Sequence, residues 1–220
     1  MPIPAPRVAM AGVAQKISGF ISTTTFGTIE AAERTMTRVR RVHDRIGGVA
    51  GERTYRAGDP DLLTWVHIAE ISSFLDSYQR FAPSPLSPAE ADLYVAQTAR
   101  AAQGIGVPDP PRSVAALDER LTAYRPVLEA GPDARDVRDF LRNPSQLNSV
   151  GVAGYSLLYR GAIATLPPYA ARLLGLPTAG PRHAADLRLG AAGVAMVRWM
   201  LSDPLIQTDR RADRRGSRES

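Results

Sequence analysis

The stretch from Thr28 to Gly48, TIEAAERTMTRVRRVHDRIGG, decides the fold because its pattern is that of one amphipathic helix. Apolar residues recur in steps of three and four, which places them on one face of an α-helix. The row consists of Ile29, Ala32, Met36, Val39 and Ile46, with His43 in one of its positions. Thr28 is a good N-cap and the glycine pair a good end. We therefore expect a continuous helix from Thr28 to Gly47 that buries Met36, Val39, His43 and Ile46.

The rest of the chain also has a helical pattern, without strict alternation and without an internal repeat. Asp59 and Pro60 are typical of a helix start, and Ser87 with Glu90 forms the sequence of a capping box. The segment between Ala50 and Pro60 is expected to be a loop. Further helices are expected near residues 8–25, 60–81, 88–104, 113–131, 133–144 and 182–202, and the stretches 149–166 and 166–177 lie before the last of them. The sequence predicts an all-α bundle of about seven or eight helices in a single domain.

Length and charge limit the classes of protein to consider. The chain has 220 residues, of which 44% are hydrophobic, enough for one domain over residues 1–207. The net charge is +5, but lysine occurs once and the arginine is accompanied by abundant Ala, Pro and Gly, as in GC-rich genomes. No nucleic-acid partner is therefore expected. Residues 208–220 are rich in arginine and lack apolar periodicity, which predicts a disordered tail, with contact to phosphate or membrane as the alternative.

The chain contains no cysteine, which excludes disulfides, thiolate catalysis, iron–sulfur clusters and cysteine-based zinc sites. The N-terminal apolar run is too short for a signal peptide. The most apolar stretch, residues 149–166, is interrupted by Arg160 and three glycines, so no transmembrane segment is expected. A cytoplasmic location is the simplest expectation.

Histidine is the informative residue type because the chain contains only three. His43 lies in the apolar row, His67 has Glu70 one turn away, and His183 is expected to be exposed at a helix start. From periodicity alone, a core histidine with one hydrogen bond is the simplest interpretation of His43. The alternative is an axial ligand of haem iron, because a large apolar macrocycle requires apolar walls. Flanking arginines can pair with haem propionates.

Other kinds of active site have weaker support in the sequence. A di-iron site needs several carboxylates and histidines on facing helices, whereas His67 and Glu70 form a single pair in the reverse order. No Gly-x-Ser-x-Gly turn is present, and the glycines near Gly104 follow a helix rather than a strand. A non-haem metal site made of His67, Glu70 and His43 stays open as an alternative.

Two blocks of sequence resemble the MpaB/rubber-oxygenase catalytic-domain family, which includes the latex clearing proteins. The first is the Val-Arg-x-x-His block ending at His43, and the second is the Tyr-x-Ala-x-Asp-Pro … Trp-Val-His block ending at His67. The segments PRVAMAGVAQ, PLSPAEADLYVAQTARAAQGIGVP and LPPYAARLLGLP add to the resemblance. It extends from about Pro6 to the last helix.

The resemblance implies an all-α, globin-like fold that binds haem b and uses dioxygen for oxidative cleavage of an apolar, often isoprenoid, small molecule. In this family the axial histidine belongs to the Val-Arg-x-x-His pattern, which maps onto His43. Met36 and Val39 share its helix face and are expected beside the cofactor. His67 and Glu70 are expected either to contact the residues that hold the cofactor, without touching the cofactor themselves, or to be purely structural.

The sequence also departs from the family pattern. The domain is N-terminally short, because the usual upstream helix is missing and Ala5-Pro6 replaces a His-Pro pair. The family's Arg-x-x-(Arg/Lys)-Thr motif, on the distal side of the haem, is reduced to VAQKIS, in which Lys16 is the remaining candidate for a distal polar group. The alternative to an oxygenase is therefore a catalytically degraded haem-binding protein, or a purely helical binding protein, of the same fold.

Overall fold

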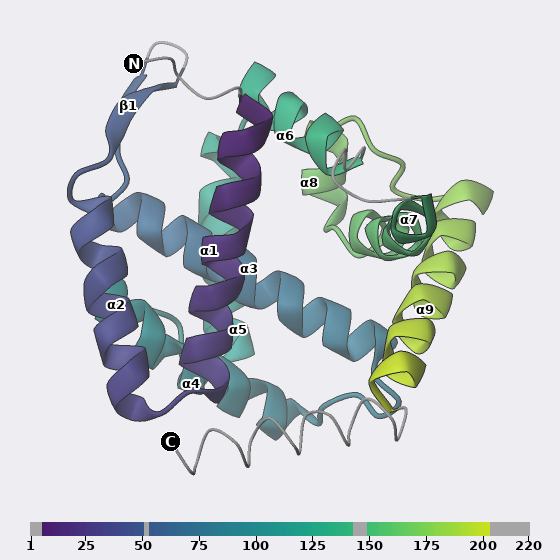
Figure 1. The fold of residues 1–220 in the computed structure, drawn as a ribbon, viewed down its shortest axis with the longest axis horizontal. Helices are drawn as coiled ribbons and strands as arrows, with labels where there is room; N and C mark the ends of the chain where they lie inside the picture. The colour runs from purple at the N-terminus through teal and green to yellow at the C-terminus, as the bar shows by residue number, and fades with distance from the viewer. Residues whose placement is uncertain (1–5, 51–52, 143–148, 203–220) are drawn as a thin grey trace. The chain divides into compact units, whose positions relative to one another are not determined.

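The computed structural model describes residues 6–50, 53–142 and 149–202, and this part of the chain is predominantly helical (Figure 1). The helices are α1 (Pro6–Phe26), α2 (Ile29–His43), α3 (Pro60–Phe81), α4 (Pro88–Ile105), α5 (Val114–Tyr124), α6 (Pro132–Arg142), α7 (Ser149–Ala164), α8 (Pro168–Leu173) and α9 (Pro181–Ser202), with a 3-10 turn at Arg125–Val127. The strands β1 (Gly47–Ala50) and β2 (Arg53–Arg56) form an antiparallel hairpin. The all-α prediction is confirmed, with nine α-helices in the described part rather than seven or eight.

The chain divides into two compact units, Met1–Asp133 and Ala134–Ser220. The expectation of one domain over residues 1–207 stays a prediction, and the expected tail at 208–220 lies outside the described residues. None of the described helices is long and apolar enough to cross a bilayer.

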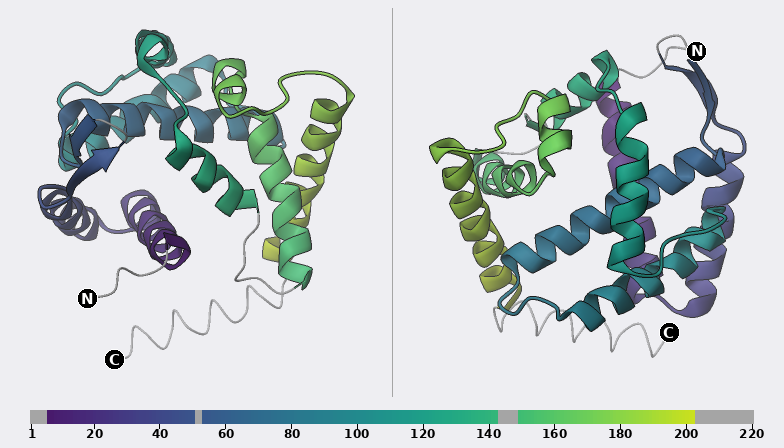
Figure 2. Two further views of the ribbon diagram at one scale, coloured as in Figure 1. Left: turned by 90° about the horizontal axis from the view of Figure 1, so that it is seen from above. Right: turned by 180° about the vertical axis from the view of Figure 1, so that it is seen from behind.

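The first unit is built around α3, which packs against α4 and α5 and crosses α5 (Figure 2). Its core consists of Ile68, Ile71, Leu75, Ala91, Val95, Leu117 and Leu121. Ile68 and Val95 are completely buried, so the α3–α4 contact excludes water. Val107 and Leu63 extend the apolar packing beyond the end of α4.

The predicted helix starts of α3 and α4 are confirmed. Asp59 caps α3 by accepting a hydrogen bond from the Asp61 backbone N–H at 2.8 Å, with Pro60 in the first helical position. In α4, Ser87 accepts from the Glu90 backbone and the Glu90 carboxylate accepts from the Ser87 N–H, so the capping box is present. These local hydrogen bonds satisfy N–H groups that have no partner inside the helix.

The prediction that the helix of the opening stretch continues to Gly47 is wrong. Thr28 caps α2 as expected, accepting from the Ala31 N–H, but the helix ends at His43. Gly47 instead pairs with Arg56 in the hairpin, whose second strand occupies part of the expected loop. Glycine has a low helix propensity, so the glycine pair does not favour continuation of the helix. The residues instead pair with β2, whose Thr54 and Tyr55 have high strand propensity.

The face of α2 is less buried than the periodicity predicts. Met36 is buried, but Val39 and His43 are only half-buried, and Ile29 and Ile46 are exposed. α2 packs against α1 and α4. At the α4 crossing, a Cβ added to Gly104 would lie 2.2 Å from the Met36 sulfur, so the small residue lets the helices approach.

The second unit is held mainly by α7 and α9, which lie side by side in Figures 1 and 2. The buried Asp186 carboxylate on α9 accepts a hydrogen bond from Arg160 on α7 at 2.7 Å. Arg138 of α6 donates to the Leu174 carbonyl oxygen at 2.9 Å, and the Tyr155 hydroxyl donates to the Leu141 carbonyl oxygen at 2.7 Å. Charged and polar groups therefore fix this small helical unit along with apolar packing.

Replacement of Arg160 by alanine should lower the free energy of unfolding, because the Asp186 carboxylate stays buried without its partner. A fully buried pair broken in this way costs about 3–5 kcal/mol, and since the Arg160 side chain is half exposed we expect about 2 kcal/mol. Urea unfolding followed by circular dichroism measures the change. Arg188→Ala, an exposed change on α9, is the control, and equal losses in the two variants would contradict the prediction.

Candidate functional site

His43 is the last residue of α2, where the chain leaves the helix for the hairpin. Its imidazole is half-buried, and Nδ1 is removed from water without a hydrogen-bond partner in the described part of the chain. A buried polar atom without a partner costs about 1–3 kcal/mol, and coordination or hydrogen bonding to a bound group would remove that cost. His43 is therefore an incompletely satisfied group at an accessible helix end.

The end of α2 lies against the turn that precedes α3. A Cβ added to Gly58 would lie 3.6 Å from the carbonyl carbon of His43 and 3.3 Å from a carboxylate oxygen of Asp44. The close approach is helped by the hydrogen bond from the Ala57 N–H to the Ile46 carbonyl oxygen at 2.9 Å. α3 therefore begins next to His43, although the two segments are joined through the hairpin.

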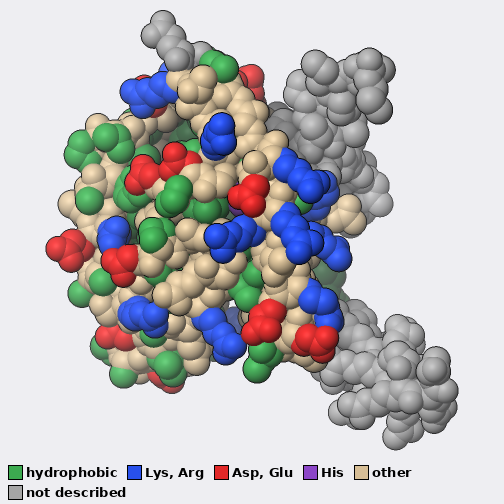
Figure 3. Space-filling model, turned by 90° about the vertical axis from the view of Figure 1, so that its left-hand side faces the viewer, with side chains coloured by type: hydrophobic (Ala, Val, Ile, Leu, Met, Phe, Trp, Pro, Cys, Tyr) green, Lys and Arg blue, Asp and Glu red, His purple; other side chains and the backbone are tan. Residues whose placement is uncertain are grey.

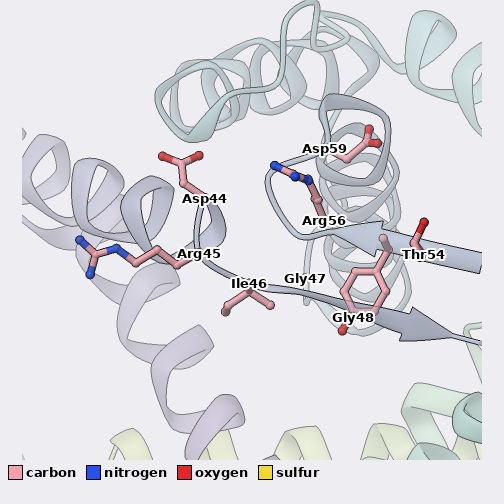
Figure 4. A pocket seen from close by; sticks show the side chains of 9 residues that line it. Asp44, Arg45, Ile46, Gly47, Gly48, Thr54, Arg56 and Asp59 are labelled. Carbon is pink, nitrogen blue, oxygen red and sulfur yellow. The ribbon is translucent and has the colours of Figure 1, made fainter.

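An open cavity of about 690 Å³ lies between the end of α2, the hairpin and the start of α3 (Figure 4). Its lining consists of Asp44, Arg45, Ile46, Gly47, Gly48, Thr54, Tyr55, Arg56 and Asp59. Most of these side chains are polar or charged, and Arg45 points away from the hairpin in Figure 4. The cavity therefore suits the polar or anionic part of a bound molecule.

His67 lies two turns into α3 and is buried. Burial lowers the pKa of this imidazole from 6.5 to about 4, because charging it would require desolvation of a cation. Its Nε2 has no hydrogen-bond partner among the described residues. His67 is a neutral, buried imidazole at pH 7.

Glu70, one turn further along α3, is half-buried, and burial raises the pKa of its carboxyl. Tyr94 of α4 lies close enough to respond to this carboxylate. Burial, followed by the charge of Glu70, raises the pKa of Tyr94 to about 12. His67 and Glu70 on α3 and Tyr94 on α4 are thus titratable groups whose pKa values burial shifts.

An apolar row runs along the exposed side of α3 at four-residue spacing. Leu62, Val66, Phe74 and Tyr78 all have side chains accessible to solvent, and Glu70 occupies the middle position of the row. Residues four apart follow one another along a helix face, so the row is continuous in space. It begins one turn after the Gly58 contact with the end of α2.

The remaining predicted residues have separate places. Lys16 is exposed on α1, Met36 is occupied by the packing against Gly104, and Val39 is half-buried beside it. His183, expected to be exposed, is half-buried in the second unit. Their predicted roles at a cofactor stay predictions.

Acidification should destabilise the protein through His67. Its folded pKa of about 4 lies below the unfolded value of 6.5, so this contribution to stability is complete above pH 6.5 and is lost as the pH falls to 4. The loss reaches about 3 kcal/mol, and Glu70, whose pKa is raised, acts with the opposite sign. Between these pH values the free energy of unfolding should therefore change less with pH in His67→Leu than in the parent protein.

His183→Leu is the matched control for this titration, because it removes an imidazole that lies outside the α3–α4 packing. It should keep the pH dependence of the parent. An unchanged pH dependence in His67→Leu would contradict the assignment.

A bare metal site is not supported by the part of the chain that the structure describes. Within it, no group of three or more His, Asp or Glu side chains could hold a metal ion. This finding weighs against the alternative made of His67, Glu70 and His43. A haem needs only one axial side chain, so it is not subject to the same requirement.

Comparison with known families identifies the chain. The family described as "ER-bound oxygenase mpaB/B'/Rubber oxygenase, catalytic domain" matches residues 8–199. Searches of curated proteins and of solved structures gave no match. The matched region covers α2, the hairpin and α3 and extends almost to the end of α9. The chain belongs to the family of mpaB and rubber-oxygenase catalytic domains, as the sequence predicts.

Proposed function

We propose that this protein is a haem b-dependent oxygenase in which the imidazole of His43 would hold the haem iron. The observation that carries the proposal is the half-buried imidazole of His43, with a buried and unpartnered Nδ1, at the end of the helix that carries the Val-Arg-x-x-His pattern. When bound, the haem iron would supply the activation of dioxygen. The oxygenase family of the chain agrees with this chemistry.

The surroundings favour His43 over His67 as the ligand. His67 is buried on α3, next in sequence to Ile68, which together with Val95 is completely buried in the α3–α4–α5 core. A macrocycle could reach that imidazole only if this packing opened. His43 lies at the end of its helix and is only half-buried, so a large group can approach it.

Arginines near His43 suit the carboxylates of a haem. Arg56 lines the cavity next to His43 and has no acidic partner in the described part of the chain. Arg40 precedes His43 by three residues and so lies on the adjacent turn of α2. Guanidinium groups bind carboxylates through paired hydrogen bonds, and these two side chains would therefore orient the propionates.

The apolar row of α3 supports an apolar substrate of the isoprenoid type. Leu62 and Val66 extend from the α2 contact, and their exposed side chains would gain about 25 cal/mol per Å² of apolar surface covered by such a molecule. Glu70 lies in the same row, where burial raises its pKa. This chain would thus bind and align the substrate, with one carboxyl whose pKa burial raises.

An absorption spectrum of the protein produced with adequate haem supply tests the proposal. We expect a Soret band that copurifies with the protein, and consumption of dioxygen with cleavage of a polyisoprene oligomer. A Soret band without dioxygen consumption would favour the binding protein of the same fold. Iron without porphyrin would favour the bare metal site, and absence of both would contradict cofactor binding by this chain.

A further inference from the structure

Four arginines form an outward row on α2 and the turn that follows it. Arg34, Arg38, Arg41 and Arg45 are separated by three or four residues, and all are exposed. At 100° per residue they lie on the side of the helix opposite the buried Met36. Figure 3, which looks at the side of the molecule that carries α2, shows several Lys and Arg side chains gathered there. We call this row the arginine face.

Most of the charge on the arginine face is uncompensated. Arg34 pairs with Glu30, and the nearby Glu33 lies 3.7 Å from Arg100. Within the described residues the other three arginines of the face have no acidic partner. Like charges on adjacent turns of a helix repel one another, so an anionic partner would relieve a repulsion that is present in the free protein.

The shape of the arginine face suits an extended surface. The open groove of about 660 Å³ at this place is lined only by residues between Glu30 and Arg45, that is, by one helix and its following turn. No second element provides an opposite wall, so the arginines do not converge on a point as they would around a single small anion. A flat array of negative charges can instead meet all of them along the helix.

Apolar side chains lie at both ends of the arginine face. Before α2, Phe26 has 86% of its surface exposed, and Val42, which lines the same groove as the arginines, has 48%. Beyond Arg45, Val49 of the hairpin is 67% exposed. Cationic side chains with exposed aromatic and aliphatic neighbours are typical of segments that lie in the interface of an anionic bilayer. This composition favours a lipid surface over an acidic protein.

From this arrangement we infer that the arginine face of α2 is a docking surface for membranes that contain anionic phospholipids. The guanidinium groups contact lipid phosphates and carboxylates, and the apolar residues at the two ends enter the headgroup region. The inference goes beyond the proposed function, and it holds whether or not the protein binds haem.

Cosedimentation of the full chain with vesicles tests the inference. The protein should sediment with vesicles of phosphatidylcholine and phosphatidylserine, remain in solution with phosphatidylcholine alone, and dissociate as salt is added. Each arginine near such a surface strengthens binding about fivefold. The triple variant Arg38→Glu, Arg41→Glu, Arg45→Glu should therefore lose on the order of a hundredfold in partition coefficient.

A second triple variant with the same change of net charge is the control. Arg112→Glu, Arg172→Glu and Arg182→Glu alter exposed arginines outside α2 and should leave vesicle binding close to that of the parent. The arginines beyond Gln207 are present in all three proteins, so a difference between the variants reports α2. Circular dichroism of each variant verifies folding.

Two results would overturn the inference. One is binding that does not depend on phosphatidylserine, or that falls equally in both triple variants. The other is failure to bind these vesicles combined with retention on immobilised polyglutamate that is lost in the α2 variant. The latter result would assign the arginine face to an acidic protein.

Discussion

His43→Ala is expected to abolish haem retention while the protein stays helical. The variant removes the proposed iron–imidazole bond, a directional bond that neighbouring apolar contacts cannot replace. Even partners that only orient a metal ligand contribute about 10–100-fold to metal affinity, so loss of the ligand itself should cost at least about 100-fold. The ratio of Soret absorbance to protein absorbance after gel filtration measures the effect, and circular dichroism follows the fold.

His67→Ala is the matched control, since it also removes one imidazole with an unpartnered nitrogen. We expect this variant to keep its Soret band, because His67 lies in the packed part of α3 and is not a proposed ligand. Loss of haem from His67→Ala but not from His43→Ala would show that the ligand has been assigned to the wrong helix. Equal retention in both variants would contradict an axial role for either residue.

The parts of the fold that the sequence predicts correctly are those that depend on neighbours in the chain. The Asp59 cap, the capping box of Ser87 and Glu90, and the N-cap at Thr28 are all present where the sequence places them. Each involves hydrogen bonds over two to four residues, so the chemistry is contained in a short window of sequence. The family pattern then adds the order of the blocks that end at His43 and His67.

The parts that the sequence does not predict depend on pairing and packing beyond a single helical turn. α2 ends early because residues 47–50 pair with residues 53–56 in a hairpin. Helical periodicity in the sequence does not predict this strand pairing. The sequence also does not predict that Gly58 lies against the end of α2 or that Gly104 lies against Met36. A glycine in a single sequence does not indicate which segment packs against it. The sequence therefore proposes residues for a candidate site, but it does not predict which segments lie next to one another.

Gly193 lies at another close approach between helices, that of α9 to α7, and its replacement by valine should have the largest effect on stability. A Cβ at this position would lie 2.9 Å from the Leu157 Cβ, 3.2 Å from the Leu158 backbone nitrogen and 3.3 Å from the Leu157 carbonyl carbon. Two of these three atoms belong to the backbone of α7, so a change of rotamer cannot relieve the contact. α9 must move away from α7, which also stretches the hydrogen bond between Arg160 and Asp186.

We expect Gly193→Val to lower the free energy of unfolding by about 3 kcal/mol and the melting temperature by roughly 10 °C. Valine has a higher helix propensity than glycine, so the isolated α9 would gain slightly and any loss must come from its packing. Ala192→Val is the control, because this neighbouring position on α9 is exposed and lies off the α7 contact. Thermal unfolding should show a loss in Gly193→Val and almost none in Ala192→Val. Similar melting temperatures for both variants would mean that α9 does not depend on this close approach to α7.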